Sequence, residues 1–214
     1  MGLFNLFKKK SKDEPVQATR EEQLLADIDI DESSLDFGAV TIDIKAVRLE
    51  IAENLLYQDE TALCEANKCI FNLPEYVQEY KNDYSKRLIE TNADKDTLKW
   101  IGVTDCIIRN NYAVELDYKC EKADFLDAIK KLKCTEKLNI TITPAMENLI
   151  AEDGNICDWS SYLDSVWADN GICIGAIDID SDSYVIFPIR VEKLNKVSAL
   201  ANSIKHRITY AQIT

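Results

Sequence analysis

The chain has 214 residues, of which 46% are hydrophobic and 29% are charged, and its formal net charge is −13. This length and composition support a sizeable core, so they exclude a wholly disordered protein. The 38 acidic side chains against 25 basic ones disfavour binding to the phosphate backbone of nucleic acids. They favour encounter with a basic partner, although solubility alone also explains such a charge.

The first residues differ from the rest in charge and pattern. Residues 1–20 carry a net charge of +3, so the remaining chain carries −16. Leucines and phenylalanines precede a lysine run within residues 1–10, a pattern that can bind weakly to an anionic membrane surface. The apolar part is shorter than two helical turns, so the favoured alternative is a frayed leader or docking peptide. Residues 1–18 are therefore predicted to be a flexible basic leader.

Residues 19–92 are predicted to be mainly helical. Thr19 and Glu22 fit a capping box at the start of a first helix. Apolar side chains then recur at three- and four-residue steps, and Pro74 suits the first position of a later helix. One stripe of that helix predicts a packing face. The stripe contains Tyr76, Tyr80, Tyr84 and Leu88.

After residue 93 the hydrophobic period alternates between helix and strand. The helices are predicted at 98–111, 125–132, 144 onward, 158–170 and 194–204. The strands are predicted at 112–118, 138–143, 172–178, 184–189 and 208–213. The fold class is therefore α+β, with a helical N-terminal part followed by a mixed or antiparallel sheet of about four to five strands packed against helices. The predicted domains are 19–92 and 93–214, or a single domain over 19–214.

The cysteines and the apolar runs indicate the compartment. Seven cysteines are scattered without any C-x-x-C pair, and an odd number disfavours a disulfide framework. Reduced thiols that act as small core residues are expected, in a cytoplasmic protein. His206 is the only histidine, so a zinc site is not expected. No run of apolar residues approaches the length of a membrane span.

The most distinctive motif lies between the two strands predicted at 172–178 and 184–189. Asp178, Asp180 and Asp182 alternate there, as at the start of a calcium-binding loop. Ser183 and Ile189 stand where such a loop requires glycine and glutamate, so metal binding is disfavoured. The pattern favours a β-hairpin turn rich in turn-forming residues. The alternative is a recognition loop that presents these three carboxylates to a basic partner.

Catalytic patterns are weak. Glu115 and Asp117 share one face of a predicted strand, a spacing that any two polar residues on a solvated face can have. His206 follows the last predicted helix, where the negative end of the helix dipole explains a histidine. The sequence has no phosphate-binding glycine loop and no nucleophile motif, so no catalytic residue and no cofactor is expected.

Four short segments carry a resemblance to a known family. They are Trp100–Gly102, 113–119, Asp124–Leu126 and 178–184. Over roughly residues 95–205 they resemble an uncharacterised family of small bacterial domains. The resemblance implies a bacterial cytosolic protein and supplies no activity. The size and charge are also similar to those of immunity proteins, which neutralise toxins.

We therefore expect a non-catalytic acidic protein that binds a basic protein partner, with an immunity-type role as one form of this function. The expected contact residues are Asp178, Asp180 and Asp182. The alternative is a carboxylate-based enzyme or a divalent-cation-binding protein that uses the same side chains. The sequence leaves the oligomeric state open.

Overall fold

A computed structural model of the chain describes residues 42–213. Within them lie ten α-helices, four strands and two short 3-10 helices. The α-helices are α2 (Ile44–Leu55), α3 (Glu60–Phe71), α4 (Leu73–Glu79), α5 (Lys81–Lys86), α6 (Lys95–Arg109), α7 (Lys122–Lys131), α8 (Lys133–Lys137), α9 (Pro144–Leu149), α10 (Ile156–Trp167) and α11 (Val191–Ser203). The strands are β1 (Val114–Asp117), β2 (Ile172–Ile177), β3 (Ser183–Arg190) and β4 (Ile208–Tyr210), and the 3-10 helices are η2 (Ala168–Asn170) and η3 (Ala211–Ile213).

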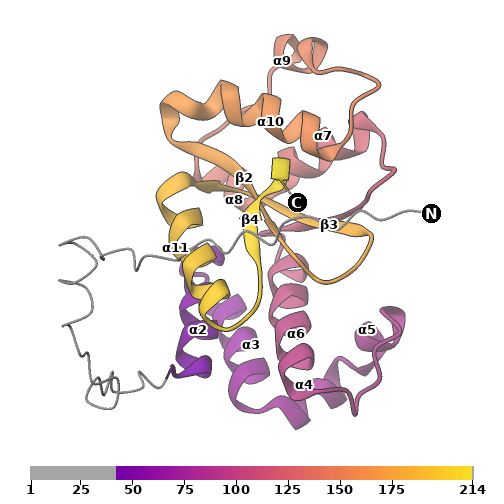
Figure 1. The fold of residues 1–214 in the computed structure, drawn as a ribbon, viewed down its shortest axis with the longest axis vertical. Helices are drawn as coiled ribbons and strands as arrows, with labels where there is room; N and C mark the ends of the chain where they lie inside the picture. The colour runs from indigo at the N-terminus through magenta and orange to yellow at the C-terminus, as the bar shows by residue number, and fades with distance from the viewer. Residues whose placement is uncertain (1–41, 214) are drawn as a thin grey trace, which may run out of the picture. The chain divides into compact units, whose positions relative to one another are not determined.

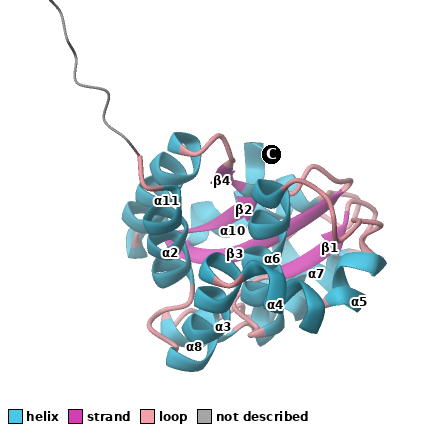
Figure 2. Ribbon diagram, turned by 90° about the horizontal axis from the view of Figure 1, so that it is seen from below, coloured by secondary structure: helices cyan, strands magenta, loops and turns pink. Residues whose placement is uncertain are grey.

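The four strands form one antiparallel sheet in the order β1-β3-β2-β4. The central hairpin pairs Ile172 with Arg190 at its base and Ile177 with Val185 near its turn. All six residues of β2 are buried, because helices cover both faces of the sheet. In Figure 1, α7 and α10 lie above the strands, and α2, α3 and α6 lie below them; Figure 2 shows the same layers from below. The predicted α+β class is confirmed.

The tyrosine stripe packs the helical part onto α6. Tyr76 donates its hydroxyl to the carbonyl of Gly102 at 2.8 Å, and Tyr84 donates to Leu98 at 2.7 Å. A side chain at Gly102 would lie 2.5 Å from the Tyr84 hydroxyl, so the missing Cβ permits this close approach. The prediction of a packing face is confirmed for these two tyrosines.

The predicted stripe is too long, because the helix does not continue to Leu88. The helix breaks at Tyr80, which separates α4 from α5, and the chain leaves α5 before Leu88. Leu88 has a positive φ of 57° and a side chain that is 92% exposed. Helical spacing alone does not register such a break, because Tyr80 and Tyr84 keep their three- and four-residue neighbours on either side of it.

The strand predicted at 138–143 is wrong. Leu138, Ile140 and Ile142 are buried and their neighbours are exposed, so the alternation of the sequence is real. This segment nevertheless pairs with no strand among residues 42–213. Leu138 and Asn139, the latter with φ of 54°, form a turn at its start, and the residues after them lay their apolar side chains directly on the core.

Several local predictions are confirmed. Asn111, after the end of α6, and Gly171, after η2, adopt left-handed backbone with φ of 61° and 62°. Thr143 caps α9 ahead of Pro144. The last strand, predicted to reach residue 213, ends at Tyr210, and η3 follows it.

Some predictions fall outside the described residues. They are the basic leader at 1–18, the membrane contact of residues 1–10 and the capping box at Thr19. Among residues 42–213, no helix combines the length and the apolar character needed to cross a bilayer.

A buried carboxyl supports the sheet from α10. Ile174 lies one residue beyond the pairing of β2 with β4, and opposite Pro188 of β3. Its N–H donates to Oδ1 of Asp164 at 2.6 Å, while Oδ2 of Asp164 is buried without a partner in the described chain. Burial raises the pKa of Asp164 to about 7, because the charged form is poorly solvated there.

This raised pKa predicts a pH-dependent stability. The folded state binds the Asp164 proton up to about pH 7, whereas an unfolded aspartate releases it near pH 4, so stability falls between these values as the pH rises. Asp164→Asn removes this penalty. Urea unfolding should show the stability of the variant, relative to the wild type, rising by about 1–2 kcal/mol between pH 5 and pH 8. This is less than full linkage, because Asp164 is only partly buried as a residue and solvent screens part of its charge. A difference that stays constant with pH would contradict the assignment.

A second prediction concerns Gly102. Alanine usually stabilises a helix interior by about 1 kcal/mol relative to glycine. In Gly102→Ala the added Cβ would collide with Cys69 Sγ and the Tyr84 hydroxyl, so we expect a net loss of about 1–3 kcal/mol in urea unfolding. Ser161→Ala, on the exposed face of α10, is the control and should be close to neutral. A stabilised Gly102→Ala variant would show that the contact between α4, α5 and α6 is loose.

Candidate functional site

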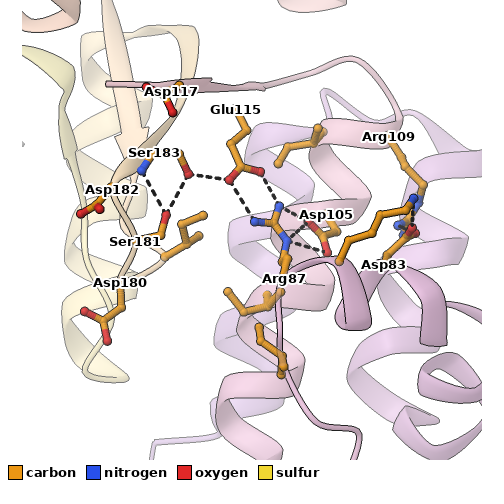
Figure 3. A pocket seen from close by; sticks show the side chains of 15 residues that line it. Asp83, Arg87, Asp105, Arg109, Glu115, Asp117, Asp180, Ser181, Asp182 and Ser183 are labelled. Atoms are coloured by element: carbon orange, nitrogen blue, oxygen red, sulfur yellow. Dashed lines mark hydrogen bonds and ion pairs between the residues drawn. The ribbon is translucent and has the colours of Figure 1, made fainter. Parts of the chain in front are cut away.

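A cleft of about 850 Å³ lies between the β2–β3 turn and the elements α5, α6 and β1. The turn comprises residues 178–183 and forms one wall, and the opposite wall carries the side chains of Arg87, Asp105 and Arg109 (Figure 3). Isoleucines from α6, from the turn and from the segment after α5 provide its apolar surface. Charged residues that are distant in sequence therefore meet around one hollow.

Arg87 is the centre of the polar wall. It follows α5 directly, and its Nη2 lies 2.5 Å from Asp105 on α6 and 2.6 Å from Glu115 on β1. Its Nη1 donates to the second Glu115 oxygen at 3.0 Å. Ser183, at the start of β3, donates its hydroxyl to the same Glu115 at 2.5 Å. One guanidinium thus joins α5, α6 and β1, and Glu115 extends the chain of contacts to the β2–β3 turn.

The two carboxylates around Arg87 differ in pKa. Burial raises the pKa of Asp105, and the charge and hydrogen bonds of Arg87 offset this only in part. Burial also opposes ionisation of Glu115, but hydrogen bonds from Arg87 and Ser183 hold its pKa below the usual range. Glu115 is therefore an ionised partner of Arg87, and this bonding leaves it poorly suited to act as a free base.

The other cations of the cleft are also paired. Arg109 donates from Nη1 to Asp83 at 2.9 Å and from Nε to Glu65 at 3.0 Å. Its guanidinium carbon lies 3.9 Å from the centre of the Tyr80 ring. The ammonium of Lys86 lies 3.1 Å from Asp83. Each basic group that lines the cleft therefore has at least one carboxylate partner within the protein.

The three predicted contact residues divide into two roles. Asp178 holds the turn together: Oδ2 accepts from Arg207 at 3.0 Å, and Oδ1 accepts from the N–H of Asp180 at 2.9 Å. Asp180 and Asp182 are exposed and line the cleft, and no side chain of residues 42–213 donates to either carboxylate. In Figure 3 both carboxylates point away from Arg87, towards the outer side of the turn.

The turn separates the cleft from two further hollows. One of about 400 Å³ is lined by Tyr118, Tyr184 and Asp182. The other, of about 550 Å³, is lined by Trp100, His206 and Asp180. The two exposed aspartates thus stand at the junction of three depressions.

His206 lies just beyond the end of α11, the helix that the sequence predicted it to follow. Its ring stacks on Trp100 with centroids 4.1 Å apart and planes within 3°. Its Nε2 lies 2.8 Å from Asp96, a residue that also pairs with Arg48. The indole N–H of Trp100 in turn donates to the carbonyl of Asp178 at 2.8 Å. This histidine therefore packs against the residue that anchors the turn.

Sequence reasoning missed Arg87 and Asp105 as site residues. They are 18 positions apart, and Glu115 is 28 positions from Arg87. No local motif links such distances, so no signal in the sequence pointed to them. Among residues 42–213 no group of three or more histidine, cysteine, aspartate or glutamate side chains is arranged to hold a metal ion.

These features define an α+β domain with a charged cleft beside its central hairpin. The chain belongs to the family described as Domain of unknown function (DUF6630), whose model matches residues 49–211. The match is longer than the resemblance noted over 95–205, and it includes α3, α4 and α5. No curated protein matches the chain, and no solved structure matches it.

The structure explains two of the segments that carried the resemblance. Trp100 anchors the turn through Asp178, and Gly102 admits the tyrosines of α4 and α5. The aspartates of 178–184 combine turn chemistry at Asp178 with exposed carboxylates at Asp180 and Asp182.

The Arg87 pairing generates a third prediction. Arg87→Met leaves the Asp105 carboxylate, whose side chain is only 10% exposed, without its cation, so we expect a loss of about 2–4 kcal/mol in urea unfolding at pH 7. Asp105→Asn in the same background removes the unpaired charge and should restore more than half of that loss. Strict additivity in this double-mutant cycle would show that the pair is not energetically coupled.

Proposed function

We propose that this protein is a non-catalytic binding protein that recognises a basic segment of a partner protein at the cleft beside the β2–β3 turn. One observation carries the proposal. The cations that line the cleft are paired within the protein, whereas Asp180 and Asp182 face solvent without a partner in the described chain. The uncompensated charge of this surface is therefore negative.

The charge balance supports a cationic ligand. Six carboxylates line the cleft against three basic groups. Asp117, on the solvent side of β1, accepts the backbone N–H of Lys119 at 2.8 Å and has no cationic partner in residues 42–213. An approaching lysine or arginine would gain favourable Coulomb interactions with three carboxylates at the rim, and such complementarity raises the association rate and the specificity.

The apolar part of the cleft supports the same ligand class. Ile101 and Ile108 of α6 and Ile179 of the turn line it. Lysine and arginine carry aliphatic stems that pack on apolar surface while their charged ends stay near water and carboxylates. A basic side chain therefore matches the apolar surface of the cleft and the carboxylates at its outer rim, and a small anion matches neither.

An immunity-type role, in which the partner is a basic toxin, is the form of this proposal that the size and the net charge of −13 favour. We also propose a cytoplasmic location, which the seven free cysteines support. Burial raises the pKa of Cys69, Cys134 and Cys173 to about 12, so these thiols are poor nucleophiles and are suited to core packing.

The test compares two variants of equal charge. Asp180→Asn/Asp182→Asn neutralises the rim of the cleft, and Asp153→Asn/Asp169→Asn neutralises two exposed aspartates elsewhere. Proteins captured from cells by the wild type are quantified by mass spectrometry at low and at high salt. We expect a basic protein that the wild type and the control variant retain and that the cleft variant loses by at least tenfold, because only the cleft variant removes its contacts.

Two results would contradict the proposal. Equal loss with both variants would show that net charge, and not the cleft, attracts the protein. Equal retention by all three proteins would show that the turn is not a contact surface. High salt should weaken the wild-type interaction, because surface charges are screened.

A further inference from the structure

Leu88 occupies an unfavourable position in two respects. It follows α5 with φ of 57°, in the left-handed region, and its side chain is 92% exposed. A left-handed backbone is strained for a residue with a branched apolar side chain, and an exposed side chain contributes no hydrophobic stabilisation. The free protein therefore gains nothing evident from a leucine at this position.

The backbone geometry identifies the residue that would suit the position. The N–H of Leu88 donates to the carbonyl of Ser85 at 3.1 Å, and the N–H of Ile89 donates to Tyr84 at 3.0 Å. These two hydrogen bonds make a Schellman motif at the end of α5, with Leu88 at the site where glycine, and sometimes asparagine, is usual. The turn itself would be made more easily by either of those residues.

Four of the other six non-glycine residues with positive φ among residues 42–213 have a visible reason, and the remaining two, Gln58 and Lys205, are polar. Asn111, Asn139 and Asp180 belong to the residue types that tolerate left-handed backbone. The strain at Tyr57 is offset by packing of its ring, which stacks on Tyr112 with centroids 6.0 Å apart. Among the non-glycine residues with positive φ in the described part of the chain, Leu88 alone is both apolar and exposed.

Leu88 stands in the chain between two residues that line the cleft. Its neighbours Arg87 and Ile89 both line the cleft, Arg87 through the ion pairs with Asp105 and Glu115. The ion pairs fix the backbone next to Leu88, so its side chain is presented from an anchored position. An exposed leucine at a fixed place, next to polar contacts, has the character of an interface anchor.

We propose that Leu88 is the apolar anchor of the partner interface. The partner would receive Leu88 in an apolar pocket and place a basic segment beside it, against Asp180 and Asp182. This inference rests on the proposed function. It adds a second requirement, that the partner carries an apolar pocket as well as a basic segment. Apolar burial supplies the affinity, and the carboxylates of the turn supply the orientation and the association rate.

The first test separates a structural role from a binding role. In the free full-length chain, Leu88→Gly relieves the left-handed strain, although the flexible unfolded state offsets part of the gain, so we expect the melting temperature to rise by about 2 °C. The same variant should retain at least tenfold less of the captured basic protein. Leu88→Asn, which suits the turn without the flexibility of glycine, should behave in the same way. A variant that is destabilised, or that binds as well as the wild type, overturns the inference.

The second test locates the partner directly. A photo-crosslinking amino acid with an aliphatic diazirine side chain, which keeps the apolar character of position 88, replaces Leu88, Asp182 or Leu149 in the full-length chain, and the cells are irradiated. Leu149 on α9 is 72% exposed, and α9 lies far from α5 in Figure 1, so it is the control for unspecific apolar contact. We expect positions 88 and 182 to give adducts with the same protein, and position 149 to give none with it.

The outcomes separate the two proposals. An adduct at position 182 without one at 88 overturns the role of Leu88 and leaves the acidic cleft in place. An adduct at 88 that is unchanged by Asp180→Asn/Asp182→Asn supports the anchor and overturns the role of the carboxylates. An adduct of twice the mass of the chain shows a second copy at the rim and overturns the basic partner, as do equal yields at 88 and 149.

Discussion

The position of the β2–β3 turn is the constraint on which the cleft depends. The turn projects beyond the sheet, and its base is held from two sides: the indole of Trp100 donates to the carbonyl of Asp178, and Arg207 pairs with the Asp178 carboxylate. The backbone N–H of Asp178 also donates to the carbonyl of Arg207. These contacts join α6 and the segment before β4 to one residue, so Asp180 and Asp182 are presented on a defined loop.

The ion pairs around the cleft follow from the small number of basic side chains in an acidic protein. Arg87 and Arg109 each serve two carboxylates, and they do so at the junctions of helices with the sheet or with one another. Buried charges require such compensation, whereas exposed ones do not. Negative charge is consequently left over only where solvent reaches it, and beside the cleft those places are the turn and Asp117 of β1. The proposed partner contact depends on this division between internal ion pairs and free carboxylates at the rim.

Local patterns predicted much of the fold but not its pairing. The hairpin, the end of α6 and the left-handed Gly171 depend on neighbouring residues, so they could be predicted from spacing and turn chemistry. The alternation at 138–143 was equally clear, yet it describes burial of one side of an extended segment and carries no information on whether a strand lies beside it. The end of α5 was missed because leucine stands where a glycine would have marked it.

The sequence by itself determined the α+β class, the acidic character and the hairpin with its three aspartates, since each is set by composition or by residues close in the chain. Only the tertiary structure decided the site. It assigned Asp178 to the turn and left Asp180 and Asp182 free, and it brought Arg87 to Asp105 and Glu115. The physical reason is that a charge's role depends on which distant groups packing brings within a few ångströms, and helix and strand periodicity carries no record of that.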